Sequence, residues 1–136
     1  MKTEIVVLTR AHLDQLGETD AQQNALRLAG PAFCLLADGE PVAAGGIVRL
    51  WGNVGKAWTL HTEKARDSAL LMRRIQKHVT TLIPVVRDVM ELERLEAETL
   101  AEPKFCTWLS RLGFIAEGKM RKYRDGKDYF RFAWVK

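Results

Sequence analysis

The segment from Lys56 to Val79 changes its hydrophobic period halfway along, and this change constrains the fold more than any other feature of the chain. Around Trp58, aromatic, β-branched and aliphatic residues favour a half-buried strand. Further along, apolar residues recur at helical spacing, at Leu71 or Met72, Ile75, Val79, Leu82 and Ile83. The segment therefore predicts a strand, a polar basic loop and a long amphipathic helix, in that order.

Short polar side chains and basic side chains surround the expected start of this helix. Asp67 and Ser68 both suit an N-cap, because a side-chain oxygen there accepts a hydrogen bond from a free amide of the first turn. Those amides and the positive end of the helix dipole favour an anion, and Lys64 and Arg66 precede them. A phosphate-bearing cofactor is one interpretation of this pattern. An ordinary capped helix with solvated basic residues is the other.

The length of 136 residues predicts a single domain, residues 1–136, that is large enough to bury a core. Hydrophobic residues make up 47% of the chain and charged residues 28%, which is typical of a soluble globular protein and excludes a disordered or fibrous one. The net charge of +4 suits an anionic ligand but is too small to indicate nucleic acid.

The two cysteines, Cys34 and Cys106, lie in apolar surroundings without the spacing of a disulfide framework or a zinc site. They predict buried, reduced thiols, a reducing compartment and no metal. The N-terminus has no signal-peptide cleavage pattern, and no window approaches the length of a membrane span. A cytoplasmic protein without a membrane partner is the resulting expectation.

Turn and cap residues divide the rest of the chain into short elements. Asp38 to Pro41 marks a hairpin turn, and Gly45-Gly46 marks a bulge or a close backbone approach. Pro84 should end or kink the long helix, with a kinked continuation favoured over a loop for residues 85–92. The expected strands are 5–8, 33–37, 42–50, the one at Trp58, 94–100, 114–124 and 127–135, with short helices from Thr9 to Gly17 and around 25–28.

Toward the C-terminus, Pro103 suits the first position of a helix that Gly113 ends. Asp125-Gly126 is a type I′ turn signal for a closing hairpin. Within strand 94–100 the alternation places Glu98 on the face opposite Leu95.

The closing hairpin is rich in basic residues and carries two tyrosines. Basic residues interleaved with aromatic ones suit contacts with phosphates and bases, so a nucleic-acid surface is one interpretation. A solvated hairpin needs fewer assumptions, and no nucleic-acid partner is expected. The residues concerned are Lys119, Arg121, Lys122, Tyr123, Arg124, Lys127, Tyr129 and Arg131.

The predicted order of strands and helices resembles the acyl-CoA N-acyltransferase (GNAT) superfamily across nearly the whole chain. The run from Trp108 to Phe114, WLSRLGF, is similar to the family's helix that ends in Leu-Gly-Phe before the next strand. The resemblance implies an α+β fold with α/β/α layers. It implies a mixed, mostly antiparallel sheet with a splayed central strand pair, and about four helices. The small size and the stretch from Gly55 to Ala65 also resemble compact GNAT-like proteins encoded by tailed phages, which would place the protein in a host cytoplasm or a virion.

The resemblance also implies acetyl-CoA as the cofactor and assigns its site. The pantetheine arm would pair with Leu60, His61 and Thr62. The pyrophosphate would lie on the segment of Lys64, Ala65, Arg66, Asp67, Ser68 and Ala69. The family pattern there is Gln or Arg, two residues, Gly, one residue, then Gly or Ala. Asp67 replaces the central glycine with a carboxylate that opposes the pyrophosphate, and Lys64 and Arg66 offset that charge.

Two family residues do not carry over: the tyrosine that often protonates the leaving thiolate falls at Leu109, and the asparagine often found at the start of that helix falls at Glu102. The titratable candidates for a general base are His61, Glu63 and Glu98. The alternatives are a strand histidine satisfied by its neighbours and solvated carboxylates at strand ends.

Two functions follow from these observations, and whether the chain is an enzyme stays open between them. The first is an acyl-CoA-dependent N-acetyltransferase that acts on a primary amine of a small molecule or a protein. The second is a catalytically inactive GNAT-fold protein that binds protein partners, as an assembly factor encoded by a phage. Neither predicts whether the chain is a monomer or a homodimer.

Overall fold

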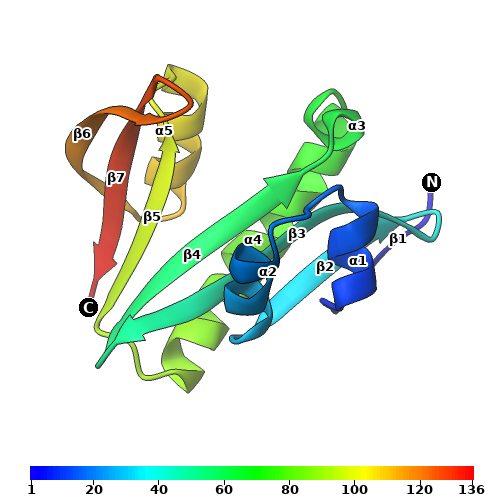
Figure 1. Cartoon of the computed structure of the whole chain (residues 1–136), viewed down its shortest axis with the longest axis horizontal. Helices are drawn as coiled ribbons and strands as arrows, with labels where there is room; N and C mark the ends of the chain where they lie inside the picture. The colour runs from blue at the N-terminus through cyan, green and yellow to red at the C-terminus, as the bar shows by residue number, and fades with distance from the viewer. The chain divides into compact units, whose positions relative to one another are not determined.

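The computed structural model describes all residues 1–136, as seven strands and five helices (Figure 1). The strands join one sheet in the order β1-β2-β3-β4-β5-β7-β6. In chain order the elements are β1 (Thr3–Val7), α1 (Arg10–Gln15), α2 (Ala21–Leu28), β2 (Ala32–Ala37), β3 (Glu40–Trp51), β4 (Val54–His61), α3 (Glu63–Arg66), α4 (Ala69–Val89), β5 (Arg94–Leu100), α5 (Pro103–Arg111), β6 (Ile115–Arg124) and β7 (Lys127–Val135).

The α+β class with a mixed, mostly antiparallel sheet is confirmed: β1, β2 and β3 pair antiparallel, as do β5, β7 and β6. β4 pairs with β5 in parallel from Val54 to Lys56. The fifth helix is the short α3, which the expectation of about four helices did not include. No helix has both the length and the hydropathy that crossing a membrane requires.

The chain divides into two compact units. The first comprises residues 1–48 and 58–86, and the second comprises residues 49–57 and 87–136. Each unit is described by itself below, and the single domain over residues 1–136 stays a prediction.

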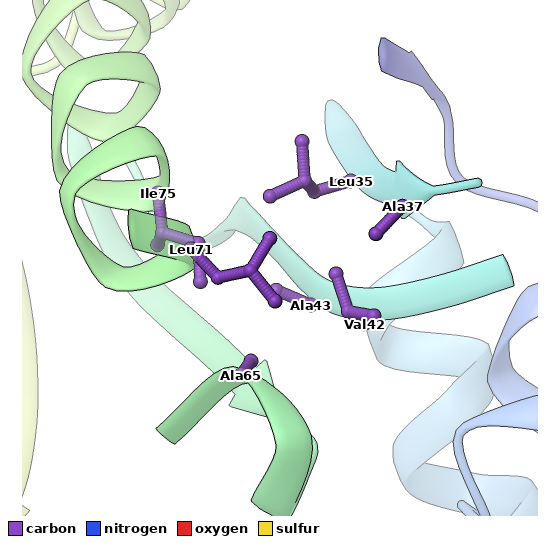
Figure 2. Close-up of a cluster of buried hydrophobic side chains, with 7 residues drawn as sticks. All are labelled: Leu35, Ala37, Val42, Ala43, Ala65, Leu71 and Ile75. Atoms are coloured by element: carbon purple, nitrogen blue, oxygen red, sulfur yellow. The ribbon is translucent and has the colours of Figure 1, made fainter. Parts of the chain in front are cut away.

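The core of the first unit forms where the start of α4 packs on β2 and β3. Leu71 and Ile75 are one helical turn apart, and Figure 2 shows both on the side of α4 that faces these strands. The cluster comprises Leu35, Ala37, Val42, Ala43, Ala65, Leu71 and Ile75. Leu71 and Ile75, which recur at helical spacing in the sequence, are therefore the buried residues of α4.

The predicted turn between β2 and β3 is confirmed, since Asp38 and Gly39 both have positive φ, at 49° and 83°. A close backbone approach at the glycine pair is confirmed too, because a Cβ on Gly46 would lie 2.6 Å from the Pro31 carbonyl oxygen. The register of this hairpin shifts between Leu35 and Leu36, where Val42 of β3 is the extra residue, so the bulge lies in β3 but not at the glycine pair.

The long helix α4 continues through Pro84 to Val89, so the continuation is confirmed and an end at Pro84 is wrong. A proline inside a helix removes one backbone hydrogen bond, and its ring crowds the preceding turn. Pro84 is exposed, where the free-energy cost of the lost hydrogen bond is lowest. The helical turn that follows Pro84 makes contacts of its own. Arg87 in that turn has its guanidinium 3.7 Å from the centroid of the Trp134 ring.

In the second unit β5 has the predicted bounds and pairs with β7 from Arg94↔Val135 to Leu100↔Tyr129. Asp125 and Gly126 have φ of 54° and 71°, as the type I′ turn between β6 and β7 requires. Pro103 opens α5, and Gly113 follows it at φ 94°. Both terminal signals of this helix are thus confirmed.

Candidate active site

The segment after β4 is a one-turn helix, α3, where the sequence predicted a loop. Thr62 caps this helix: its Oγ1 accepts a hydrogen bond from the Ala65 amide at 3.2 Å and donates one to the Val42 carbonyl at 3.2 Å. Ala65 is fully buried beneath the turn. The capping threonine followed by the acidic Glu63 was the signal that sequence reasoning missed.

Only one of the two N-cap candidates for α4 has that role. The Ser68 hydroxyl accepts a hydrogen bond from the Leu71 amide at 3.2 Å. Asp67 instead ends α3, with φ −84° and ψ −5°, so its assignment as an N-cap is wrong. Because α3 is a helical turn, Asp67 lies one residue before Ser68, which caps α4.

The backbone around this turn leaves few free amides for an anion. The amides of Arg66, Asp67 and Ser68 all donate to carbonyls of α3 and its cap, at 2.9 to 3.2 Å. Ala69 and Leu70 are exposed, and their amides, in the first turn of α4, have no protein acceptor. The Lys64 and Arg66 side chains are exposed beside them. An anion here would meet two basic side chains and one free helix start.

Glycine is not required for the backbone at position 67. The φ of −84° lies in the right-handed helical region that any L-residue adopts. The departure from the GNAT pattern therefore costs nothing in conformation, and its consequence is the exposed carboxylate of Asp67 alone. Lys64 and Arg66 are close in sequence, so the residues present fit a pyrophosphate. The carboxylate of Asp67 weakens the positive field that these two side chains provide.

His61 is the last residue of β4 and is half-buried. Its carbonyl accepts a hydrogen bond from Arg66 Nη1 at 3.3 Å. Burial lowers the pKa of the His61 imidazole below its usual 6.5, and the charge of Arg66 lowers it further. The imidazole is consequently neutral at pH 7 and able to take up a proton.

Glu63 opens α3 and is exposed, in the first turn where a carboxylate favours the helix dipole. Glu63 therefore has the surroundings expected of a solvated carboxylate. His61 and Glu63 belong to the first unit, whereas Glu98 belongs to the second.

Glu98 on β5 has a side chain only 9% exposed, so its interpretation as a solvated strand-end carboxylate is wrong. Lys56 Nζ and Tyr123 Oη each donate to Glu98 Oε1 at 2.9 Å. Burial raises the pKa of Glu98, but these two hydrogen bonds and the charges of Lys56 and Arg124 outweigh it, so the net pKa is below the usual value. Glu98 is therefore ionised, and its Oε1 already accepts two hydrogen bonds.

Three cations surround that carboxylate, and sequence reasoning did not connect them with it. Lys56 comes from β4, Arg131 from β7 and Arg124 from β6, with nitrogens 2.9, 3.8 and 4.0 Å from Glu98 oxygens. Lys56 is 42 residues from Glu98 in the chain. Only the strand order β4-β5-β7-β6 brings them together.

The positions of the two missing family residues have structural roles here. Leu109 is buried, with 5% exposure, and belongs to the apolar side of α5. Glu102 is the N-cap residue of α5 and makes no side-chain cap bond. Cys34 is buried, which raises the pKa of its thiol to about 11, so it is not a nucleophile. No group of three His, Cys, Asp or Glu residues is arranged to hold a metal ion.

No protein-family model matches the chain, and no curated protein is similar to it in sequence. Solved structures are similar in fold. The ribosomal-protein-S18-alanine N-acetyltransferase from Escherichia coli superposes with a TM-score of 0.73 at 16% identity, over 98% of this chain and 94% of that one. A mutant spermidine N-acetyltransferase from Vibrio cholerae gives 0.73 at 12% identity, over 97% and 94%.

A third structure, the IAA acetyltransferase from Bacillus cereus, gives a TM-score of 0.71 at 12% identity, over 99% of this chain and 100% of that one. All three are acetyltransferases, and the match spans nearly the whole of each chain. The chain therefore has the GNAT fold that its sequence resembles.

Proposed function

We propose that the protein is an acyl-CoA-dependent N-acetyltransferase that transfers an acetyl group to a primary amine. The observation that carries this proposal is the GNAT fold with an exposed basic segment, Lys64 to Ala69, after β4. Similar solved structures bear the names of spermidine and protein-alanine N-acetyltransferases, whose acceptors are amines.

The first unit supplies the groups that would hold acetyl-CoA. Lys64, Arg66 and the amides of Ala69 and Leu70 would bind its pyrophosphate. The Thr62 amide already donates to the Val42 carbonyl at 3.0 Å, so we assign the pantetheine pairing to Leu60 and His61. When bound, acetyl-CoA supplies an activated acetyl thioester.

We assign removal of the acceptor's proton to His61. A general base must be unprotonated at the working pH, and the lowered pKa of His61 meets that condition. Glu63 is a weaker candidate, since its carboxylate is exposed at the start of α3. Glu98 is weaker still, because Lys56 and Tyr123 donate to its Oε1 and, with the neighbouring cations, lower the pKa of its carboxyl.

Calorimetric titration of acetyl-CoA tests the cofactor site, and Asp67 sharpens the test. We expect micromolar binding by the wild type and binding about threefold to tenfold tighter in Asp67→Asn, since an exposed carboxylate near a pyrophosphate costs on the order of 1 kcal/mol. Asp67→Gly should behave like Asp67→Asn, because position 67 has an ordinary helical φ. Asp14→Asn, an exposed carboxylate on α1, is the matched control and should change nothing.

An unchanged affinity in both Asp67 variants would contradict the assignment of the pyrophosphate to this segment. No binding by the wild type at millimolar acetyl-CoA would contradict the transferase itself.

The second candidate is a GNAT-fold protein without catalysis that binds protein partners, as a phage-encoded assembly factor would. The observations that favour it are the carboxylate of Asp67 and the engagement of the Asp67 and Ser68 amides within the chain. Failure of acetyl-CoA to bind would select this candidate and direct the search to protein partners.

A further inference from the structure

A cluster in the second unit has charged groups that the proposed reaction does not use. The Glu98 cluster consists of Lys56, Glu98, Tyr123, Arg124, Tyr129 and Arg131. Glu98 and Arg131 are directly opposite in the β5 and β7 register, so their side chains share one face of the sheet. Leu95 and Ala97, which are buried, lie on the other face of β5.

The arginines of the cluster have donors that no protein group accepts. Lys56 and Tyr123 take the near oxygen of Glu98 at hydrogen-bond distance. Arg131 and Arg124 remain 3.8 and 4.0 Å from the carboxylate, beyond hydrogen-bond reach. Arg131 Nε is buried and is not reached from solvent. The Nη groups at the exposed ends of Arg124 and Arg131 are the ones left to donate to an oxyanion.

The surface of the cluster is positive although its centre is a carboxylate. Glu98 is 9% exposed, whereas the side chains of Arg124 and Arg131 are 59% and 41% exposed. Three cations face Glu98, and the Glu117 carboxylate also interacts with Arg131, so three positive and two negative charges leave an excess of one positive charge. A ligand approaching this face meets arginines and not the glutamate.

Two tyrosines restrict the position of the more exposed arginine. The rings of Tyr123 and Tyr129 are 5.7 Å apart, and the guanidinium of Arg124 lies 5.9 and 5.6 Å from their centroids. Stacking on aromatic rings orients a guanidinium and leaves its edge donors free. The planar fork of donors then matches the two oxygens of a carboxylate or phosphate.

We propose that Arg124 and Arg131 bind a carboxylate or phosphate group of a small ligand. This oxyanion site lies within the second unit and does not depend on the proposed transferase function. A polyamine would meet like charge at this face and is not expected to bind there.

Titration with inorganic phosphate at constant ionic strength tests the site without any activity. We expect millimolar binding with amide shifts at Glu98 and Arg131, followed by NMR, and about tenfold weaker binding in Arg131→Gln or Arg124→Gln. Arg131→Lys, which keeps the charge but not the fork, should give an intermediate loss. Arg121→Gln is the matched control, because Arg121 is an exposed arginine of β6 outside the cluster.

Equal weakening in Arg121→Gln, or no phosphate binding by the wild type, would overturn the proposal. A single-stranded oligonucleotide that binds more tightly than phosphate, and that Arg121→Gln weakens as much as Arg131→Gln, would assign the hairpin to nucleic acid and overturn it as well.

The oxyanion site and the transferase function are tested separately. If phosphate binds as expected but no amine is acetylated, the oxyanion site stands and the transferase function fails.

Discussion

His61→Ala is expected to lower kcat/KM for acetyl transfer by roughly a hundredfold to ten-thousandfold, the usual contribution of a positioned general base. The loss should be in the rate and not in acetyl-CoA affinity, since His61 is assigned to proton removal. His78→Ala is the matched control, because His78 on α4 is also a half-buried histidine with a lowered pKa. Steady-state kinetics with acetyl-CoA and an active amine measure both variants.

The pH dependence of the acetyl-transfer rate tests the same assignment of His61. Because burial and Arg66 lower the pKa of His61, the wild-type rate should rise with pH through a value below 6.5 and be level at pH 7. Full activity in His61→Ala, or a rate that does not fall on acidification, would contradict the assignment. Glu98→Gln should retain activity within about tenfold, because its carboxylate is already occupied.

Leu71→Ala is expected to destabilise the fold by about 2 to 5 kcal/mol, as removal of a fully buried leucine does. Leu71 is 1% exposed in the cluster that joins α4 to β2 and β3 (Figure 2). Leu70→Ala is the control at the adjacent position, where the side chain is 42% exposed and the change should cost less than about 1 kcal/mol.

Both substitutions have the same helix propensity change, so the difference between them reports burial alone. Chemical denaturation followed by circular dichroism measures both free energies of unfolding. Equal losses for Leu70→Ala and Leu71→Ala would contradict the orientation of α4.

Local sequence patterns predicted the elements of the fold because local forces determine them. The period of Leu71 and Ile75 gave the buried side of α4, and Asp125-Gly126 gave a turn in which both residues have positive φ. Thr9, where the sequence predicted the start of a helix, caps α1: its hydroxyl accepts a hydrogen bond from the His12 amide at 3.3 Å. Each of these signals acts within a few residues.

The prediction failed where two local interpretations competed. Residues 63–66 are polar and basic, which suggested a loop, but the Thr62 cap and the burial of Ala65 make them a helical turn. Because of that turn, Asp67 is the C-cap residue of α3 and not the expected N-cap of α4. Pro84 was also ambiguous, because an exposed proline permits the helix to continue.

The Glu98 cluster could not be predicted from the sequence, because its members meet only through the pairing of β4, β5, β7 and β6. Glu98 is 42 residues from Lys56 and 25 from Tyr123. Alternation within β5 correctly separated Glu98 from Leu95, but it carries no information on the neighbouring strands. A solvated glutamate and a buried, paired glutamate have the same local pattern.

The most direct test of the account is product formation. The purified protein is incubated with acetyl-CoA and a panel of acidic, uncharged, polyamine and peptide amines, while free CoA thiol and the mass of each amine are measured. The account predicts thiol release that depends on both protein and amine, with one acetyl group added to the amine. Binding of acetyl-CoA without acetylation of any amine on the panel would contradict the proposed transferase.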